Sequence, residues 1–197
     1  MAKSTPRFLK IDFSDAVIVP WEPDHLLYGK GFQCRRSEFQ SHYKKRVPRD
    51  VKKYLGKCWI IAENKKLVGY ITLLADKLKI EGGTRTQKLL KKEDVIYTSF
   101  PAVKIGILAV DERTRGAGTA LMDWAIYYIA KEINPRLGVR FVTVDALYDK
   151  EAKPQYDISA FYEKFGFRFA NPKQRIPPKD GIRTMYYDLK DLLDRQG

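Results

Sequence analysis

The stretch from Val103 to Leu121, VKIGILAVDERTRGAGTAL, constrains the fold more than any other part of the chain. Its first half is a β-branched, apolar run that predicts a buried strand, and its second half has the apolar spacing of a helix. The turn between the two contains Gly116 and Gly118. A helix that opens directly after a strand presents unpaired main-chain N–H groups and the positive end of its dipole, which together favour a bound phosphate.

The spacing of the glycines excludes two common classes of phosphate-binding loop. The turn has neither the G-x-G-x-x-G pattern of dinucleotide-binding folds nor the G-x-x-x-x-G-K-[ST] pattern of P-loops. It reads R-x-x-G-x-G from Arg113 to Gly118, after a strand that ends in L-A-V-D. Glycine lets a ligand approach the main chain, and Arg113 and Arg115 add donors for phosphate oxygens. The turn therefore predicts a pyrophosphate site, with an ordinary basic connector as its alternative.

A second motif follows one predicted strand later. Residues 159–167, SAFYEKFGF, predict a short amphipathic helix that ends at Gly166, with Phe167 starting the next strand. Together the two motifs resemble the GCN5-related N-acetyltransferase (GNAT) family, in which R-x-x-G-x-G binds acetyl-CoA and a Tyr-x-x-x-Gly-Phe helix packs beside the thiol end of the cofactor. The matching tyrosine here is Tyr162. The alternative is that Phe161 and Tyr162 are aromatic core residues.

The resemblance implies a set of site residues. Tyr162 would protonate the leaving thiolate, because a phenol with a pKa of about 10 can supply a proton in a closed site. The main chain at Leu108 would polarise the acetyl carbonyl. Asp145 is the candidate general base, with a turn or cap role as its alternative. The residues expected to contact acetyl-CoA are Leu108, Ala109, Val110, Arg113, Thr114, Arg115, Gly116, Ala117, Gly118, Thr119, Phe161 and Tyr162.

Alternating predicted strands and helices indicate an α/β protein. Strands are expected at 57–63, 67–78, 103–110, 139–147, 167–170 and 184–189, and helices at 35–54, 117–131 and 156–165. The first two strands predict a hairpin, Pro48 is expected to divide the first helix, and Asn134 with Pro135 to end the second. The strands on either side of helix 117–131 should be parallel, as in a βαβ unit. The resemblance implies the GNAT fold, a mixed, mostly antiparallel sheet whose central parallel pair splays to bind acetyl-CoA.

A chain of 197 residues fits a single N-acetyltransferase domain over 1–197. Residues 80–93 are expected to form a mobile loop inside it, because two glycines and a high charge density leave little to pack. No apolar run approaches the roughly 20 residues of a membrane span, and the sequence shows no secretory signal. We therefore expect a cytoplasmic protein without a membrane partner.

The cysteines and histidines do not indicate a metal site or a disulfide framework. Cys34 and Cys58 are far apart in the sequence, without clustered partners, and predict free thiols at buried or half-buried positions. His25 and His42 lie outside any catalytic spacing and are expected at the surface. No metal is therefore expected.

Further segments resemble the toxin-type acetyltransferases, which are paired with small antitoxins. They are FPAVKIGILAVD at 100–111, Phe32-Gln33-Cys34, and GYITL at 69–73. Members of that class acetylate the α-amino group of an amino acid esterified to tRNA, which stops translation. The resemblance implies acetyl-CoA as cofactor. As partners it implies an amine substrate, with aminoacyl-tRNA among the candidates, an antitoxin protein and a second copy of the chain.

Charge gives independent evidence on the substrate. The formal net charge is +13, and between Arg35 and Lys57 only Glu38 and Asp50 oppose a run of basic residues. Such a surplus can hold a polyanion by its phosphates, although a solvated basic face has the same composition. The residues expected to contact nucleic acid are Arg35, Arg36, Lys44, Lys45, Arg46, Arg49, Lys52 and Lys53.

The strand expected at 103–110 has no carboxylate that could deprotonate an attacking amine. A lysine side chain, with a pKa of about 10.4, needs such a base, whereas an α-amino group, with a pKa of about 7.7–8.0, is already partly neutral. The sequence thus favours an α-amine acceptor. A protein N-terminus, a lysine, a polyamine and a small antibiotic-like amine are alternative acceptors. Cationic acceptors would need an acidic pocket, for which the candidates are Asp145, Asp149, Glu151 and Asp157. A non-catalytic acyl-CoA sensor or RNA-binding module is the alternative of another class.

Overall fold

The computed structural model describes residues 17–80, 84–176 and 180–194. Contacts divide the chain into two compact units. The first unit contains Met1–Leu74 and Gly106–Tyr127, and the second contains Ala75–Ile105 and Tyr128–Gly197. Strands β3 (Lys66–Leu78) and β4 (Phe100–Val110) each pass from one unit to the other.

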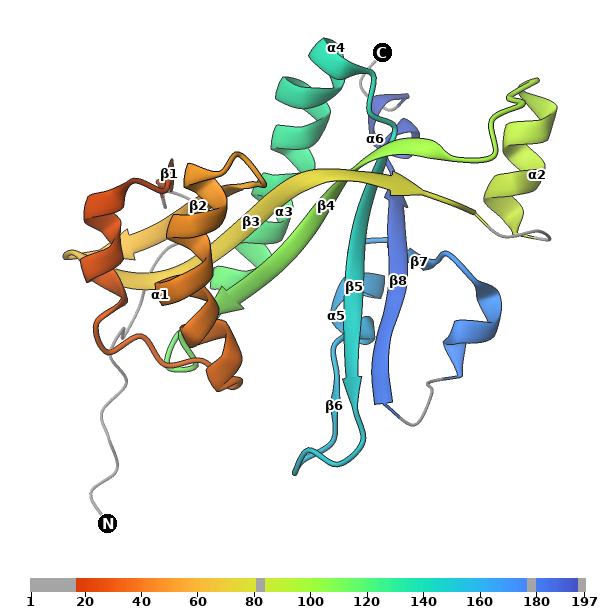
Figure 1. Cartoon of the computed structure of the whole chain (residues 1–197). Coiled ribbons are helices and arrows are strands. Elements are labelled where there is room, and N and C mark those ends of the chain that lie inside the picture. Colours follow the sequence, from red (N-terminus) through yellow and green to blue (C-terminus); the bar gives the residue numbers. More distant parts are fainter. Residues whose placement is uncertain (1–16, 81–83, 177–179, 195–197) are drawn as a thin grey trace. The chain divides into compact units, whose positions relative to one another are not determined.

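Each of the other elements lies in the unit that holds most of its residues. Figure 1 labels the helices α1–α6 and the strands. The first unit has β1 (Ile18–Pro20), the 3-10 helix η1 (Pro23–Gly29), α1 (Ser37–Lys52), β2 (Lys57–Glu63) and α3 (Ala117–Tyr128). The second unit has α2 (Arg85–Lys92), η2 (Ile129–Ile133), α4 (Asn134–Leu137), β5 (Phe141–Asp149), β6 (Tyr156–Asp157), α5 (Ser159–Lys164), β7 (Arg168–Phe169), η3 (Pro172–Arg175), β8 (Asp180–Asp188) and α6 (Lys190–Leu193).

Strands β2 and β3 form the hairpin that the sequence predicts. Their antiparallel register closes with Glu63 opposite Lys66. The turn residues Asn64 and Lys65 both have positive φ, 49° and 56°. That backbone gives a two-residue turn whose twist matches the twist of the strands. β1 pairs antiparallel with β2 and extends this part of the sheet.

Helices α1 and α3 cover opposite faces of the hairpin (Figure 1). Cys58 and Ile60 of β2 belong to a buried cluster with Tyr43 of α1. Trp59 lies between them in the sequence and faces the other way, with its ring centroid 5.3 Å from that of Trp124 in α3. Successive side chains of a strand point to opposite faces. Because both faces are covered, β2 is apolar along most of its length rather than alternating with polar residues.

Pro48 lies inside α1, and the prediction that it divides the helix is wrong. The helix runs unbroken from Ser37 to Lys52. Proline removes one main-chain donor and crowds the preceding turn. Tyr43 and Val47, each only 1% exposed, anchor the same helix in the core. Tertiary packing therefore outweighs the local penalty.

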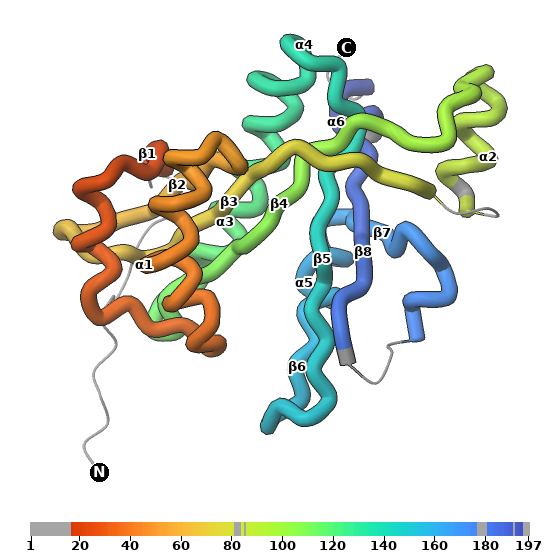
Figure 2. Tube along the Cα trace, viewed as in Figure 1, coloured from red at the N-terminus to blue at the C-terminus, as the bar shows by residue number. Residues whose placement is uncertain are grey.

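In the second unit, β5 is paired along both edges. Its ladder with β4 is parallel and joins residues 102–105 of β4 to 141–144 of β5. Its ladder with β8 is antiparallel and extends from the Phe141–Asp188 pair to the Asp149–Asp180 pair. Figure 2 shows the traces of β5 and β8 side by side. β7 pairs with β8, and β6 pairs with the end of β5.

The sheet of the described residues has eight strands in the order β1-β2-β3-β4-β5-β8-β7, with β6 beside β5. The structure confirms the predicted fold class, an α/β protein with a mixed, mostly antiparallel sheet and a central parallel pair, β4 and β5. The last registered pair of that ladder joins Ile105 to Val144. That the pair splays to bind acetyl-CoA stays a prediction.

The helical path after α3 continues further than the sequence predicts. The π-helical turn η2 and the short helix α4 follow α3 directly, so the prediction that Asn134 and Pro135 end the helix is wrong. Proline is tolerated in a first helical turn because its missing N–H has no acceptor there. The path ends at Gly138, which has a φ of 63°. This left-handed residue is a common helix stop.

The segment 80–93, expected as a mobile loop, contains the helix α2. The Thr84 hydroxyl caps it by accepting from the Gln87 N–H at 3.1 Å. The Tyr186 hydroxyl donates to Thr86 Oγ1 at 2.7 Å, and Leu90 is 2% exposed. The helix therefore has both a cap and buried contacts. Residues 81–83 lie outside the described ranges, and the mobility of the segment stays a prediction, as does a single domain over 1–197.

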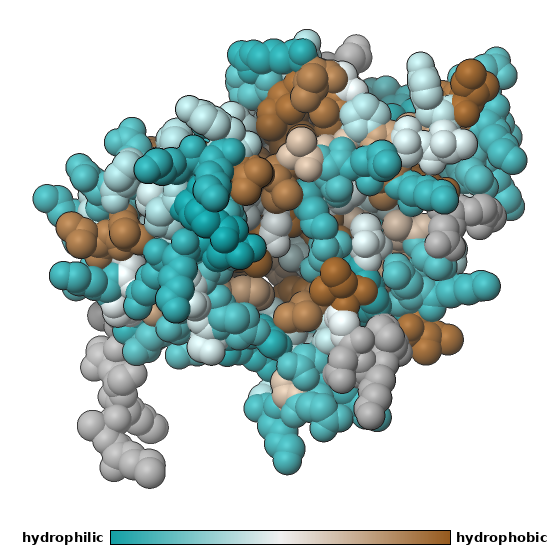
Figure 3. Space-filling model, viewed as in Figure 1, coloured by the Kyte–Doolittle hydropathy of each residue, from teal (hydrophilic) through white to brown (hydrophobic). Residues whose placement is uncertain are grey.

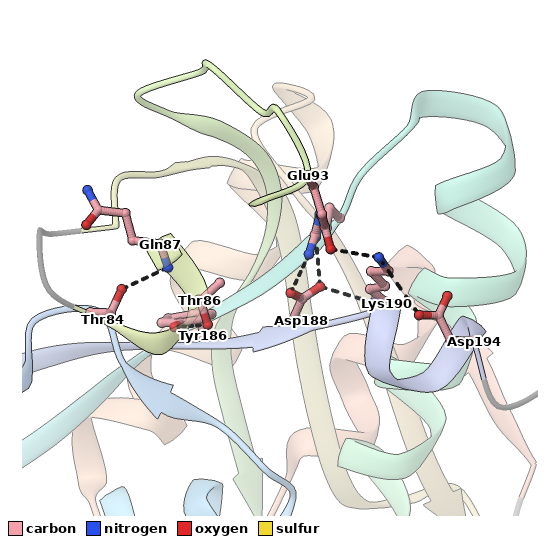
Figure 4. A network of polar contacts seen from close by, with 9 residues as sticks. Thr84, Thr86, Gln87, Glu93, Tyr186, Asp188, Lys190 and Asp194 are labelled. Atoms are coloured by element: carbon pink, nitrogen blue, oxygen red, sulfur yellow. Dashed lines mark hydrogen bonds and ion pairs between the residues drawn. The ribbon is translucent and has the colours of Figure 1, made fainter. Parts of the chain in front are cut away.

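A polar network holds the end of α2 to β8, to α6 and to Arg140, the residue before β5 (Figure 4). Glu93 accepts from Lys190 at 2.7 Å and from Arg140 at 2.8 Å. Arg140 also makes two bonds to Asp188, at 3.0 and 2.9 Å. The hydrogen bonds from Lys190 and Arg140 lower the pKa of Glu93. The network connects segments that are distant in the sequence.

Candidate functional site

The turn between β4 and α3 is built around Asp111. This residue is fully buried, and its N–H donates to the Val68 carbonyl at 2.8 Å. Thr114 donates to the Asp111 carbonyl from its N–H at 2.9 Å and from its hydroxyl at 2.7 Å. These bonds fold residues 111–114 into a defined turn that leads into the start of α3.

The side chain of Arg113 holds the turn together through hydrogen bonds to Asp111 and to the Gly31 carbonyl. Its Nε donates to Asp111 Oδ1 at 2.6 Å, and its Nη2 donates to Asp111 Oδ2 at 2.5 Å and to the Gly31 carbonyl at 2.7 Å. Burial alone would raise the pKa of Asp111, but the hydrogen bonds from Arg113 and from the Gln33 N–H outweigh it and lower that pKa. The sequence predicts Arg113 on a pyrophosphate. In the structure its guanidinium shapes the turn, and its contact with phosphate stays a prediction.

The N-terminus of α3 has the geometry of an anion site. Gly116 has a φ of 87°, a backbone that strains any residue with a Cβ. The Ala120 N–H donates to the Gly116 carbonyl at 3.0 Å. The N–H groups of 117–119 come before this bond, in the first turn, where a helix offers its main-chain donors and the positive end of its dipole. Arg115 is exposed beside them. Thr114 and Ala117 are buried, whereas Gly118 and Thr119 are accessible.

The end of β4 that precedes this turn is closely packed. Ala109 is 4% exposed, while Leu108 and Val110 are half-buried. A Cβ on Gly69 would lie 3.1 Å from the Ala109 carbonyl oxygen and 3.1 Å from Val110 Cγ1. The structure thus places the predicted residues 108–119 on one strand, turn and helix start in the first unit. Phe161, Tyr162 and Asp145 belong to the second unit.

The second motif is a helix C-cap. The Phe167 N–H donates to the Tyr162 carbonyl at 3.2 Å, and the Gly166 N–H donates to the Glu163 carbonyl at 2.9 Å. Gly166 has a φ of 90°. These two bonds and the positive φ define a Schellman motif, in which an apolar contact such as that between Phe167 and Tyr162 is common. The helix is shorter than predicted, because Tyr156–Asp157 forms β6 and α5 begins at Ser159.

Tyr162 is held as a neutral phenol in an aromatic environment. It is 8% exposed, and its ring centroid lies 5.5 Å from that of Phe161 and 5.7 Å from that of Phe167. Burial raises its pKa well above the ordinary value, and the charges of Tyr156 and Asp145 add to the effect. The phenol therefore keeps its proton at neutral pH, as a proton donor must before it acts.

A buried arginine supports the start of α5, and the sequence does not reveal it. Arg183 of β8 is 1% exposed, bonds to the Asp157 carboxylate, and donates to Ser159 Oγ at 3.2 Å. Its guanidinium carbon lies 5.4 Å from the Tyr148 ring centroid and 5.2 Å from the Phe169 ring centroid. A single basic residue in an amphipathic strand does not indicate burial by itself. Its neighbours come from other segments and depend on how the strands pair.

Asp145 has partners of its own. It lies within β5, so the turn or cap role considered for it is wrong. Its Oδ2 lies 2.5 Å from Lys104 Nζ, and its Oδ1 accepts from the Thr184 hydroxyl at 3.2 Å. Both carboxylate oxygens are thus engaged. Its role as general base stays a prediction.

Two of the other three acidic residues expected to hold a cationic acceptor, Asp149 and Asp157, are also engaged, while Glu151 is exposed. Asp149 accepts from the N–H groups of Glu151 and Ala152, and Asp157 accepts from Ser159 and Arg183. The positive charge of Arg183 offsets the negative charge of Asp157, which leaves less net negative charge there for an outside cation. In the described ranges, no group of three or more His, Cys, Asp or Glu side chains is arranged to hold a metal ion. None of the helices in that part of the chain is long and apolar enough to cross a membrane.

The basic run lies on and around α1, where Figure 3 shows hydrophilic side chains. Arg36, in contrast, is half-buried and paired with Glu38. Asp50 accepts from Arg49 at 2.9 Å and lies 4.0 Å from Arg46. The basic residues of the run that are exposed are Arg35, Lys44, Lys45, Arg46, Arg49, Lys52 and Lys53. The helix therefore presents a positively charged face.

His42 differs from the prediction of a surface residue. It is half-buried on α1, and its ring stacks on Tyr70 with an interplanar angle of 8° and a centroid distance of 6.1 Å. Burial lowers its pKa, so the imidazole is neutral at pH 7. Its neighbour Cys58, like Cys34, is a buried free thiol, as predicted. The apolar residues spaced along α1 were the available signal that one side of His42 faces the core.

Comparison with known proteins shows which solved structures share this fold. A scan against models of protein families finds no match, and a search of curated proteins finds none either. Solved structures, in contrast, match over almost the whole chain. The chain therefore shares its fold with AtaT and KacT, among other solved structures.

Three of these structures show how close the similarity is. "AtaT complexed with acetyl-methionyl-tRNAfMet" has a TM-score of 0.74 at 18% identity and covers 93% of this chain and 100% of that one. A tyrosine-to-phenylalanine mutant of KacT has a TM-score of 0.72 at 18% identity and covers 91% and 98%. A tyrosine-to-phenylalanine mutant of the AtaT toxin, bound to the C-terminus of the antitoxin AtaR and acetyl-CoA, has a TM-score of 0.65 at 19% identity and covers 92% and 99%. At these identities the likeness is one of fold.

Proposed function

We propose that this chain is an acetyl-CoA-dependent N-acetyltransferase. The proposal is carried by the turn from β4 into α3, where Gly116 has a φ of 87° directly before the first N–H groups of a 12-residue helix. This turn occurs in a chain whose fold matches AtaT, one structure of which contains acetyl-CoA. A helix start that follows such a turn suits a pyrophosphate.

The residues of the turn fit the phosphate end of acetyl-CoA. The N–H groups of 117–119 would hold the pyrophosphate, and the exposed Arg115 would add positive charge. Gly116 cannot be replaced by a residue with a Cβ without strain at this φ. The Asp111–Arg113 pair would keep the turn in place before the cofactor binds.

Acetyl-CoA, when bound, supplies a thioester whose carbonyl carbon an amine can attack. The main chain of β4 at Leu108 would donate to the carbonyl oxygen as negative charge develops there. The amine nitrogen forms its bond to the acyl carbon, and the carbon–sulfur bond breaks. Tyr162 would give its proton to the departing sulfur, and the phenolate would regain the proton that the amine nitrogen loses as its bond to the acyl carbon forms.

For the acceptor we propose the α-amino group of an aminoacyl-tRNA. Support comes from the basic face of α1, which can bind phosphates without reading sequence. AtaT, which has the same fold, has been solved with acetyl-methionyl-tRNAfMet. An α-amino group with a pKa of about 7.7–8.0 also needs no strong base, which agrees with the pairing of Asp145 to Lys104.

Other acceptors have less support. A polyamine or aminoglycoside would be repelled by a chain with a net charge of +13, and two of the four acidic residues that could attract it, Asp145 and Asp157, are paired with basic residues of the second unit. A protein N-terminus or a lysine has no matching feature among the described residues. An antitoxin and a second copy of the chain are proposed partners, and the AtaT structure with its antitoxin supports the first of them. Substrate and partners of this kind place the proposed function in the cytoplasm.

The test incubates the purified chain with acetyl-CoA and a mixture of aminoacyl-tRNAs and measures the release of free thiol. Thiol release that requires both components, with acetylated aminoacyl-tRNA as product, supports the proposal. Uncharged tRNA and free amino acids are the controls. Binding of acetyl-CoA without turnover would instead identify the chain as an acyl-CoA sensor, and binding of tRNA alone would identify an RNA-binding module.

A further inference from the structure

A pocket of about 240 Å³ opens in the first unit, next to the proposed acyl site on β4. Val47 and Val51 of α1, Leu74 of β3 and Ile107 of β4 are among its apolar residues. His42 and Asp50 of α1 also line it, and the Asp50 carboxylate accepts from Arg49 at 2.9 Å. The pocket is smaller than the roughly 300–1,000 Å³ of sites for drug-sized ligands, so its size suits a single side chain.

The pocket has an inner wall and an open mouth. Val47 and Cys58, on the inner wall, are 1% and 3% exposed. Leu55, which precedes β2, is 60% exposed, and Lys57 is exposed as well. The mouth therefore opens near the start of β2, beside a positive charge.

The inner wall offers little to a polar ligand. The Cys58 thiol is directed to the Trp59 carbonyl at 3.7 Å, and burial raises its pKa, so it stays neutral. The Thr72 hydroxyl oxygen accepts from the Ile107 N–H at 2.8 Å. Because these polar groups already have partners, a charged or polar group placed there would lose its hydration without compensation. An apolar group would gain by its burial.

The position of the pocket on β4 connects it to the proposed reaction. Gly106 and Ile107 line it and directly precede Leu108, whose main chain is the proposed donor to the acetyl carbonyl. A group bound in the pocket would thus lie beside the acyl carbon. This step rests on the proposed function.

The same helix that walls the pocket carries the basic face. Along α1, His42, Val47 and Val51 line the pocket, while Lys44 and Lys45 are exposed. A ligand that fills the pocket and also contacts the exposed lysines of α1 would need an apolar group close to a polyanion. We propose that the pocket receives the aliphatic or thioether side chain of an aminoacyl group esterified to RNA, while the basic residues of α1 contact the RNA phosphates.

The experiment measures kcat/KM for methionyl-, leucyl-, glycyl- and aspartyl-tRNA with saturating acetyl-CoA. We expect the methionyl and leucyl substrates to exceed the glycyl and aspartyl substrates by at least about ten-fold, since each buried methylene contributes to discrimination. Leu74→Phe should lower the methionyl-to-glycyl ratio by at least about ten-fold because the larger ring fills the pocket. Val51→Phe fills it from the opposite element and should act in the same direction. Leu137→Phe, at a residue of α4 that is 69% exposed, is the matched control and should keep the wild-type ratio.

The outcomes separate this proposal from the proposed function. Equal rates on all four substrates, or an unchanged ratio in both pocket variants while acetyl-CoA still binds, overturn the pocket proposal and leave acetyl transfer intact. Acetylation of a peptide with N-terminal methionine, with methionyl-tRNA unmodified, overturns the RNA part and identifies a protein acceptor. Binding of acetyl-CoA with no acetylation of any aminoacyl-tRNA by the wild-type chain overturns the proposed function, and the pocket proposal with it.

Discussion

The Arg113 guanidinium and the Asp111 carboxylate face each other through two hydrogen bonds, Nε to Oδ1 at 2.6 Å and Nη2 to Oδ2 at 2.5 Å. Asp111 is completely buried and the Arg113 side chain is 21% exposed. The first arginine of the glycine turn is therefore part of the scaffold that fixes the turn. Such a pair is costly to break from the Arg113 side, because the Asp111 charge would stay buried without its ion-pair partner.

Replacing Asp111 by Asn should destabilise the fold by about 1–3 kcal/mol, since the amide keeps the shape but leaves the Arg113 charge without its partner. Urea unfolding followed by circular dichroism measures the change. Glu112→Gln, an exposed acid in the same turn, is the control and should leave the midpoint unchanged. Equal midpoints for wild type and Asp111→Asn would show that the pair contributes nothing to stability.

The Asp111–Arg113 pair also predicts a dependence of stability on pH. The pKa of Asp111 is lower in the folded chain than its ordinary value, so its contribution is fully present above about pH 4. The contribution is lost as the pH falls from there through the folded-state pKa, because protonation then favours the unfolded chain. The free energy of unfolding, measured between neutral and acid pH, should fall less steeply in Asp111→Asn. Parallel curves for the two proteins would contradict the assignment.

Gly116→Ala should weaken acetyl-CoA binding. At a φ of 87° the Cβ costs about 1–2 kcal/mol, and relief of that strain moves the first N–H groups of α3. Gly138→Ala is the matched control, because Gly138 also has a positive φ, 63°, at a helix end with no atom within 4 Å of its added Cβ. Both variants should lose stability, and only Gly116→Ala should show a higher dissociation constant in calorimetry. A similar constant for both would remove this turn from the cofactor site.

Tyr162→Phe should reduce kcat by about 10²–10⁴-fold, the usual contribution of a general acid, with little change in acetyl-CoA affinity. The ring contacts with Phe161 and Phe167 do not need the hydroxyl, so the fold should be retained. Tyr127→Phe, at a tyrosine that is 58% exposed, controls for loss of a hydroxyl elsewhere. Wild-type turnover in Tyr162→Phe would exclude the proton-donor role.

Neutralising the basic face of α1 should raise KM for aminoacyl-tRNA without changing the affinity for acetyl-CoA. The variant replaces Lys44, Lys45 and Lys52 by Gln, and the control replaces Lys88, Lys91 and Lys92 of α2, which are also exposed. Each lost phosphate contact should reduce the slope of log K against log salt by about 1. An equal loss in both triple variants would indicate a general charge effect rather than a binding face on α1.

Local elements followed from the sequence where the determining contacts are themselves local. The hairpin at Asn64 and Lys65 and the stop at Gly166 depend on the backbone of a few consecutive residues, and both predictions are confirmed. Helix continuation was misjudged at Pro48 and at Asn134, where a proline in a first helical turn is tolerated. At Pro48, the buried side chains of the same helix decided the outcome.

The side-chain partners were the hardest part to predict. The structure pairs Arg113 with Asp111 and Asp145 with Lys104, and the sequence predicted neither pair. The phosphate contact of Arg113 and the role of Asp145 as general base stay predictions. Lys104 and Asp145 are adjacent only because β4 and β5 lie in parallel register. The apolar pattern of a strand specifies which face is buried but not which residue of the next strand stands opposite.

By itself the sequence determined where the backbone turns and what chemistry each turn offers, because positive φ at glycine, helix starts and charge density are properties of neighbouring residues. Only the tertiary structure decided that Arg183 supports the start of α5 and that His42 lines an apolar pocket. Those contacts join residues far apart in the chain. They depend on strand register and helix packing, which no local pattern encodes.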